Sequence, residues 1–243
     1  GEDPQEWLPT MPPQFGKIEL MAGLGNYTQN TSLVTAGSVS GSNNLTPNIL
    51  VRGELWLNPE WYVGVQLRQS VFSIDNNLTG SSPGSLNMSV GQYGVSAGYN
   101  FLLTSDFFGP KLQVGAGYNT TKFSVDNSTP TAFTTMDYSG FLISLAGQFP
   151  LSEELPVDIG GRFDFYMNPN VSESKDSGSS SDSKINSFSF FVDYRMKTRF
   201  KIRGELMLEN YSTDFTGTGQ RTDPATSTSH KMTTLFGGVQ YLF

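Results

Sequence analysis

Four pairs of oppositely charged residues are each separated by a single residue: Arg52 with Glu54, Arg162 with Asp164, Asp193 with Arg195, and Arg203 with Glu205. Residues two apart share one face of a β-strand, where they also reach partners on neighbouring strands. A charged face of this kind has two uses. It forms a salt-bridge network that fills a narrow interior and holds it rigid, or it lines a polar path for small solutes.

The single histidine offers little for catalysis. His230 directly follows Ser229, and adjacent strand residues point to opposite faces, so the two side chains cannot pair as base and nucleophile. A lone histidine near a loop is usually solvated. The acidic segment around Glu173, Asp176 and Asp182 lacks the ligand spacing of a calcium loop. We therefore expect no enzymatic activity, no metal site and no cofactor.

Composition narrows the class of protein. The 243 residues contain no cysteine, which excludes disulfides, thiolate metal sites and a cysteine nucleophile. No run of about 18 apolar residues is present, so no transmembrane helix is expected. The formal net charge of −7 argues against nucleic-acid binding, which normally needs a basic face. Abundant Gly, Ser, Thr and Asn favour strands joined by turns.

Alternation of apolar and polar residues predicts ten β-strands. They span residues 15–28, 49–57, 61–72, 88–102, 110–124, 135–149, 157–167, 187–196, 199–211 and 230–243. The connections at one end are predicted to be long and polar: 29–48, 73–87, 125–134, 168–186 and 212–229. Those at the other end are short. This alternation and the even count indicate an all-β fold, an antiparallel up-and-down transmembrane β-barrel over residues 15–243. Eight strands is the second choice, with the hairpin around 168–186 outside the membrane.

The polar face of these strands carries every strand-borne charge. A Lys or Arg facing mid-bilayer lipid would cost roughly 2–4 kcal/mol, so this avoidance is informative. The predicted lumen-lining residues are Arg52, Glu54, Arg68, Arg162, Asp164, Asp193, Arg195, Lys201, Arg203, Glu205 and Glu209. A soluble β-sandwich or lipocalin-like barrel would show the same alternation with its apolar face inward. The many glycines among these charges suit a crowded lumen better than a free surface.

Aromatic residues on the apolar face gather at the short-turn ends of the strands. We predict that they form a membrane-interface girdle: Trp61, Tyr99, Phe101, Phe149, Tyr194, Phe200, Tyr241 and Phe243. Such girdles flank the apolar band of transmembrane barrels, and their segregation by height also argues against a soluble barrel.

The last strand ends on an aromatic residue and carries Leu235, Val239, Tyr241 and Phe243 on one face. This ending resembles the C-terminal signature of bacterial outer-membrane β-barrels, whose assembly machinery recognises an aromatic-terminated strand. The N-terminus has no positively charged n-region and apolar h-region and begins Gly1-Glu2-Asp3-Pro4, so we expect a mature secreted protein whose signal peptide has been removed. The omptins, outer-membrane proteases of ten strands, are similar in strand number. Their chemistry needs a His–Asp pair and a further acidic pair at the rim, and no Asp adjoins His230.

These observations predict a small outer-membrane barrel of a Gram-negative bacterium that forms a narrow passive channel for small polar solutes or ions. The alternative is a closed structural barrel whose extracellular loops bind surfaces. Outer-membrane lipids, lipopolysaccharide and the assembly machinery are the expected partners. Nucleic acid is not. Residues 1–14 contain four prolines, which are unsuited to a central strand, and we expect a periplasmic tail.

Overall fold

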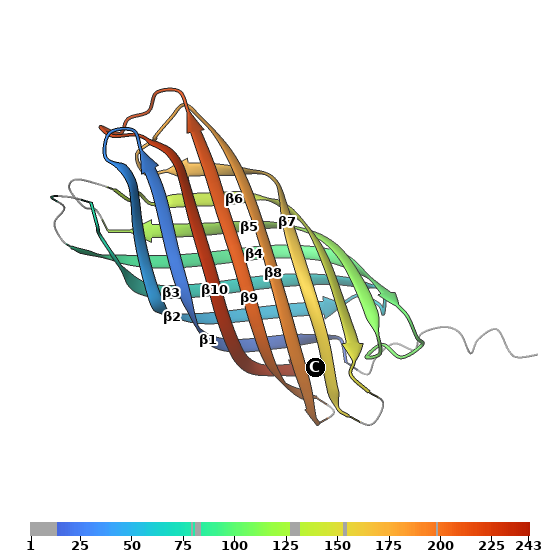
Figure 1. Cartoon of the computed structure of the whole chain (residues 1–243). Helices are drawn as coiled ribbons and strands as arrows, with labels where there is room; N and C mark the ends of the chain where they lie inside the picture. Colours follow the sequence, from blue (N-terminus) through green and yellow to red (C-terminus); the bar gives the residue numbers. More distant parts are fainter. Residues whose placement is uncertain (1–13, 79, 81–83, 127–131, 153–154, 198) are drawn as a thin grey trace, which may run out of the picture.

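The computed structural model describes residues 14–78, 80, 84–126, 132–152, 155–197 and 199–243 (Figure 1). Ten strands account for almost all of them: β1 (Gly16–Leu33), β2 (Gly37–Trp56), β3 (Trp61–Asp75), β4 (Ser85–Leu102), β5 (Lys111–Val125), β6 (Met136–Pro150), β7 (Val157–Glu173), β8 (Ser180–Lys197), β9 (Phe200–Thr216) and β10 (Ala225–Leu242). The described residues include no helix long and apolar enough to cross a bilayer. The tail predicted at 1–14 lies outside the described residues, apart from Gln14.

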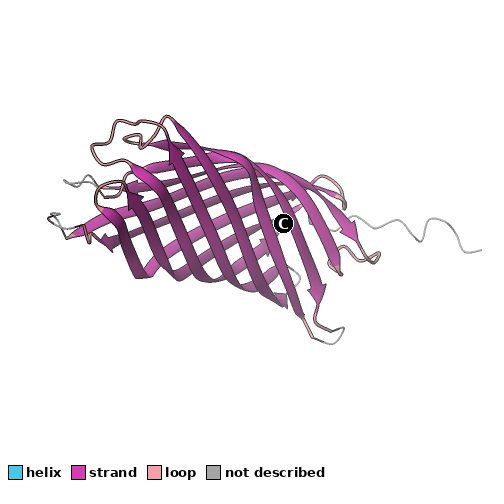
Figure 2. Cartoon of the chain, turned by 45° about the horizontal axis from the view of Figure 1, so that its top comes forward, coloured by secondary structure: helices cyan, strands magenta, loops and turns pink. Residues whose placement is uncertain are grey.

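Every strand is antiparallel to its two neighbours, and β1 pairs with β10 to close a barrel (Figure 2). The closing seam is long, because the register runs from Lys17 opposite Leu242 to Leu33 opposite Ala225. The predicted all-β, ten-stranded antiparallel barrel is confirmed, and the eight-strand alternative is wrong. Closure leaves no unpaired sheet edge, which is a requirement for a β-structure that crosses a membrane.

The two faces of the wall have opposite chemistry. In β9, Phe200 and Ile202 point outward with almost half of their surface exposed, whereas Lys201 and Arg203 point inward and are buried. The alternation predicted for this strand is therefore confirmed. In this part of the wall, apolar side chains stand outside and charged ones inside, which is the reverse of a soluble barrel.

The barrel has two distinct ends. We call the end with connections 34–36, 76–84, 126–135, 174–179 and 217–224 the loop end, and the end with connections 57–60, 103–110, 151–156 and 198–199 the turn end. Both ends of the described chain, Gln14 and Phe243, lie at the turn end, where the Phe15 N–H donates to the Phe243 carbonyl oxygen. In Figure 1 the loop end is at the upper left.

The strands are longer at the loop end than the sequence predicts. Most of the segments expected to be loops at 29–48, 168–186 and 212–229 is strand, the loop expected at 73–87 shortens to 76–84, and 125–134 nearly matches. β2 runs for 20 residues, although about 9–11 suffice to cross the hydrocarbon core. Outward residues in the added part are polar, such as Ser38 and Ser40, so the alternation of hydrophobicity disappears while the hydrogen-bonded ladder continues.

A bulge in β7 changes which residues face inward. Asn168 has a φ of 44°, in the left-handed region that Asn tolerates, and the β6–β7 register shifts between Ser139 and Phe141. Before the bulge the even-numbered Asp158 faces inward, and beyond it the odd-numbered Glu173 does. The bulge thus aims a carboxylate into the loop-end mouth.

Candidate functional site: the barrel interior

The half of the lumen nearer the loop end is filled by apolar side chains. We call this cluster the plug. Its buried members are Tyr27, Leu33, Val39, Phe72, Ile74, Leu86, Met88, Val90, Phe123, Ala132, Phe133, Met136, Tyr138, Leu142, Tyr166, Ile185, Tyr211, Ala225 and Met232. Phe123 lies near its centre, with ring centroids 5.0 Å from Tyr211 and 5.8 Å from Tyr138. The described side chains of the plug therefore pack closely across this half of the lumen.

His230 lies inside the plug and is fully buried, so the expectation of a solvated histidine is wrong. Its ring stacks on Phe123 with centroids 4.1 Å apart. Nδ1 lies 2.7 Å from the Tyr27 hydroxyl, and Nε2 lies 3.3 Å from the Met136 sulfur. Strand parity points the side chain inward, and the length of β10 beyond it places His230 below the mouth rather than at the rim.

A polar cluster caps the plug at the loop end. The buried Arg221 guanidinium donates to Glu173 Oε1 at 3.1 Å, to Ser177 Oγ at 3.2 Å and to the Ala132 carbonyl at 3.2 Å. Glu173 also accepts from the Thr134 hydroxyl at 2.5 Å and from the Ser177 N–H at 2.7 Å. Three connections at the loop end are therefore joined over the lumen.

Charged side chains occupy the middle of the lumen, and we call them the charged belt. Arg52 of β2 forms a bidentate pair with Glu205 of β9, at 2.7 and 2.9 Å. Arg68 of β3 pairs with Glu209 of β9. These strands are not neighbours in the sheet, so the pairs cross the interior. Each of these two pairs therefore ties together strands that share no ladder.

Arg203 is the centre of the belt. Its Nε and Nη2 each lie 2.7 Å from an oxygen of Asp193, and its Nη1 lies 3.3 Å from Glu19. Its guanidinium also lies over the Phe191 ring, 4.0 Å from the centroid. All these groups are almost fully buried, which makes the arrangement a satisfied ionic network rather than a set of surface pairs.

The partners in the belt differ from the pairs seen in the sequence. Of the four pairs, Arg162 with Asp164 is the close one, at 2.8 Å, and Arg203 with Glu205 is a longer contact of 3.7 Å. The remaining members bind elsewhere. Glu54 accepts from Trp56 and lies 3.5 Å from Lys17, while Arg195 lies 3.7 Å from Asp158. Asp193 pairs with Arg203, which lies directly opposite it on the neighbouring strand β9.

The residues predicted to line the lumen fall into three groups by burial. The buried ones are Arg68, Asp193, Lys201, Arg203, Glu205 and Glu209. The half-buried ones are Arg52, Glu54, Arg162 and Asp164. Arg195 is exposed at the turn-end mouth. The charged interior also includes Glu19, Lys17, Lys111 and Asp158. Strand parity predicts them on the polar face, but they were not in the predicted lining set.

Below the plug a polar cavity of about 100 Å³ remains, counted as the space open to the centre of a water-sized sphere. We call it the chamber. Its charged lining comprises Lys17, Glu19, Arg52, Glu54, Arg162, Asp164 and Arg203. The space exists because several lining residues are small, among them Gly64, Gly94, Ser96, Ala146 and Ser189. A water needs about 10–15 Å³ by this measure, so the chamber has room for several.

An aromatic cluster lies between the chamber and the turn end. It comes partly from a turn and includes Tyr62, which also lines the chamber. Phe107, in the connection 103–110, is buried against Trp56 with ring centroids 4.7 Å apart. Lys111 Nζ lies 4.6 Å from the Phe107 centroid, and Phe107 packs on Phe108. The sequence pattern predicts only a short turn at this connection. Two adjacent phenylalanines in an otherwise polar turn were the available signal.

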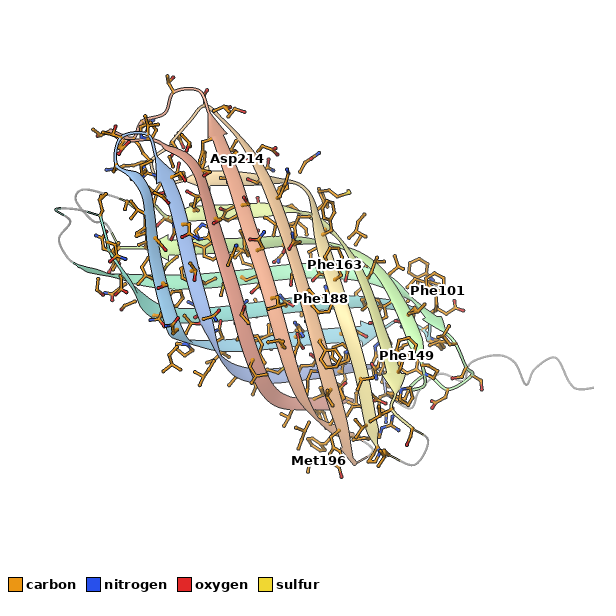
Figure 3. All side chains as sticks on the ribbon, viewed as in Figure 1. Phe101, Phe149, Phe163, Phe188, Met196 and Asp214 are labelled. Atoms are coloured by element: carbon orange, nitrogen blue, oxygen red, sulfur yellow. The ribbon has the colours of Figure 1, made fainter. Side chains whose placement is uncertain are left out.

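The aromatic residues predicted to form a girdle all point away from the lumen near the turn end. Trp61 packs edge-on against Tyr99, and Tyr99 against Phe101, at 5.2 and 4.8 Å between centroids. Phe200 contacts Tyr241 at 5.1 Å. Phe149, Tyr194 and Phe243 are likewise exposed. Figure 3 shows Phe101, Phe149 and Met196 projecting outward near the turn end, whereas Asp214 lies near the loop end.

Metal binding finds no support in the described part of the chain. It contains no group of three or more His, Asp or Glu side chains arranged to hold an ion. The lumen carboxylates that lie closest together each have a cationic partner instead, as Glu19 has in Arg203 and Arg52.

Comparisons with known proteins identify the fold. No protein-family model matches the chain, and no curated protein matches its sequence. Among solved structures, the outer membrane protease OmpT from Escherichia coli is 13 % identical with a TM-score of 0.57, over 96 % of this chain and 98 % of that one. The translocator domain of autotransporter NalP from Neisseria meningitidis is 12 % identical, with a TM-score of 0.45 over 98 % and 92 %. An outer membrane channel from Pseudomonas putida F1 is 8 % identical, with a TM-score of 0.44 over the whole of both chains.

The chain therefore has the fold of the bacterial outer-membrane β-barrels. At 13 % identity, the likeness to OmpT shows a shared architecture and carries no activity with it.

Proposed function

We propose that this protein is an outer-membrane barrel that is closed at rest and acts through its loop-end rim. The filled plug is the observation that carries the proposal. A barrel of eight strands is just filled by its side chains, whereas sixteen to eighteen strands enclose an aqueous channel. This ten-stranded barrel lies near the filled limit, and in its loop-end half the filling is apolar and aromatic.

The outer surface supports residence in the outer membrane. Leu, Val, Ile and Phe side chains stand exposed on every strand, which would be unfavourable in water and is suited to lipid. In this orientation the loop end faces outside and the turn end faces the periplasm. Outer-membrane lipids and lipopolysaccharide surround the apolar band, and the girdle aromatics sit at its periplasmic edge. The outward Tyr241 and Phe243 of the final strand would be read by the assembly machinery.

The rim is built to present a fixed surface. Asp223 accepts hydrogen bonds from the Thr35 and Ala36 N–H groups at 2.8 and 2.9 Å, which joins the β1–β2 and β9–β10 connections. Arg221 and Glu173 join the other side of the mouth. Strand extensions rich in Ser, Thr and Asn carry this rim beyond the apolar band. A rigid polar rim suits binding to an external surface, because little ordering is needed on contact.

The narrow passive channel is the second candidate, and the chamber favours it. A polar cavity with charged walls occupies the turn-end half of the lumen. Conduction would still require the plug to rearrange. We assign no enzymatic activity, because among the described residues the His230 ring nitrogens meet only Tyr27 and Met136 and no carboxylate.

Single-channel recording of the refolded protein in a planar bilayer separates the two candidates. Insertion is verified by the heat-dependent gel mobility typical of folded barrels. The closed-barrel proposal expects a flat baseline. Steady conductance steps whose ion selectivity changes in Arg162→Ala or Arg203→Ala would overturn it and establish the channel. Loss of whole-cell surface binding when connection 217–224 is replaced by a short Gly-Ser turn would support a function at the rim.

A further inference from the structure

One connection at the turn end reaches into the lumen. The connection 103–110 is the longest of the four at this end. It carries Phe107, whose ring is buried, and the adjacent Phe108, which is half-buried. In the other three connections, every described side chain is exposed or half-buried. Connection 103–110 therefore covers part of the lumen as well as joining β4 to β5.

The turn within this connection, residues 104–109, is a self-contained unit. The Phe108 N–H donates to Asp106 Oδ1 at 2.9 Å, and the Gly109 N–H donates to the Asp106 carbonyl oxygen at 3.0 Å. Among the residues that the structure describes, no hydrogen bond joins this turn to a strand. Segments without such bonds open locally at low cost in free energy, so the turn can move as a unit.

Ring contacts hold the turn in its place. Phe107 packs edge-on against Trp56 of β2 at 4.7 Å between centroids, and Phe108 packs against Phe107 at 5.2 Å. Lys111 Nζ lies 4.6 Å from the Phe107 centroid, and Lys201 Nζ lies 5.8 Å from that of Phe108. A cation over an aromatic face is attracted to it. The closed position is therefore stabilised by side chains from β2, β5 and β9.

Lys111 also contributes a term that opposes closure. Its side chain is buried, and within the described part of the chain its ammonium forms no hydrogen bond or ion pair. The carboxylates that interact with it at longer range belong to Glu54 and Asp158, which already bind Lys17 and Lys201. A buried charge without a hydrogen-bonded partner is unfavourable. Opening would hydrate this ammonium, which offsets part of the loss of the ring contacts.

The turn lies between the chamber and the turn end. The aromatic cluster in this position consists of Trp56, Tyr62, Phe107 and Leu242, with Leu102 and Phe108 packed against it. The two phenylalanines come from the connection, and the other members come from strands. Strand residues are fixed by the ladder, so Phe107 and Phe108 are the members that can withdraw. Toward the loop end the whole plug intervenes.

We propose that connection 103–110 is a lid that opens the charged half of the lumen to the turn end. Phe107 and Phe108 move out together, and water and small solutes then reach Lys111 and the chamber. The plug stays in place, so the interior exchanges with one side of the membrane only. The lid is independent of any binding at the rim.

The test is the rate at which a single thiol inside the charged half reacts with a charged, water-soluble thiol reagent. Gln148→Cys places the thiol opposite Lys111 and on the chamber wall, in a chain that otherwise has no cysteine. The refolded full chain in detergent micelles presents both ends to the reagent. We expect labelling at least tenfold slower than for the exposed Ser38→Cys and at least tenfold faster than for Met232→Cys in the plug.

A ring variant of the Gln148→Cys protein tests the lid itself. Phe108→Ala removes the contacts with Phe107 and Lys201 and keeps the backbone bonds of the turn, so the labelling rate should rise at least fivefold. Phe101→Ala is the matched control, because this ring also lies near the turn end but projects outward (Figure 3). Its rate should change less than twofold.

Three results would overturn the lid. The first is equal labelling rates with Phe108→Ala and Phe101→Ala. The second is a Gln148→Cys thiol that reacts as fast as Ser38→Cys, which would mean that the mouth is open at rest. The third is a Gln148→Cys thiol that reacts as slowly as Met232→Cys, which would mean that the turn does not move. The last two comparisons use the unaltered lid, so they stand even if Phe108→Ala fails to fold. None of them depends on conductance or on whole-cell binding.

Discussion

The two halves of the lumen are filled by side chains of opposite chemistry. Both are enclosed by the same ten strands and receive every second side chain from each. The loop-end half is filled by rings and aliphatic chains, with His230 as its one ionisable imidazole. The turn-end half is filled by ion pairs, both between neighbouring strands, as in Arg203 with Asp193, and between strands that share no ladder, as in Arg52 with Glu205, and it contains the chamber. Apolar filling stabilises by area and shape, whereas ionic filling stabilises only if each charge keeps its partner.

This difference in filling indicates which half of the barrel can change conformation. A packed plug has no small set of contacts whose loss opens a path. The charged half contains the chamber, and between the chamber and the turn end lies the cluster to which one connection contributes Phe107. A chain of side-chain hydrogen bonds joins the halves, from Arg52 through Gln66 and Gln92 to Thr121, at 3.0, 2.9 and 3.2 Å. Any functional movement is expected in the turn-end half, with the plug as the fixed wall.

The largest expected effect comes from breaking the charged belt. Arg203→Met leaves Asp193 and Glu19 buried with less compensation, and breaking a buried pair in this way typically costs about 3–5 kcal/mol. Urea unfolding of the protein in lipid vesicles, followed by tryptophan fluorescence, measures the change in the free energy of unfolding.

Arg162→Met is the matched control, because Arg162 is also a lumen arginine with a carboxylate partner. Its side chain keeps 31 % of its surface exposed to the chamber, so the pair is hydrated and its loss is expected to cost about 0–1 kcal/mol. Equal losses in the two variants would show that the belt and the chamber wall do not differ in hydration.

Part of this comparison was predictable from the sequence. Parity alone points Arg203 and Glu205 inward and Phe200 and Ile202 outward, because a strand has a strict period of two. The ring of charges and the barrel follow from that pattern. Partner choice does not follow, since Arg52 and Glu205 are 153 residues apart and meet only through the stagger of the closed sheet.

The sequence also does not show how deep in the barrel each residue lies. The same parity points His230 inward, but the sequence does not show how far β10 continues above it. Ser, Thr and Asn occur both in loops and on strand faces that meet water, so the strand extensions were read as loops. Phe107 was missed because aromatic residues in turns are usually interpreted as part of the surface.

Removing one ring from each half gives the next effect. Phe123→Ala opens a cavity at the centre of the plug and is expected to cost about 3–5 kcal/mol. Phe107→Ala is expected to cost less, about 2 kcal/mol, because the connection 103–110 relaxes more easily than a strand. The same urea unfolding measurement applies to both.

Phe107→Ala, which is expected to cost less stability than Phe123→Ala, should have the larger effect on access to the chamber. The chain has no cysteine, so Ser96→Cys at the chamber wall provides a single thiol for a charged, water-soluble reagent. Adding Phe107→Ala should raise the labelling rate at least tenfold, and adding Phe123→Ala should change it less than twofold. Faster labelling with Phe123→Ala than with Phe107→Ala would place the entrance at the loop end instead.

The smallest expected effect concerns the rim above the plug. Although partial burial raises the pKa of Asp223, hydrogen bonds from the Thr35 and Ala36 N–H groups lower it more, and the net pKa lies below the ordinary value. A carboxyl whose pKa is lowered by folding stabilises the folded state above its unfolded pKa, and this contribution is lost as the pH falls through the folded pKa. Asp223→Ala should therefore cost about 0.5 kcal/mol at pH 7, at the low end for a half-exposed acceptor.

The pH dependence distinguishes this rim contact from the interior. The difference in unfolding free energy between wild type and Asp223→Ala should be constant from about pH 5 to 8 and should shrink below about pH 4, the ordinary range for Asp. Ser38→Ala is the control, because Ser38 is an exposed residue near the rim that is not among the groups that shift the Asp223 pKa, and it should show no such pH dependence relative to wild type. A difference for Asp223→Ala that persists unchanged at pH 2 would mean that the side chain acts there by packing and not by its charge.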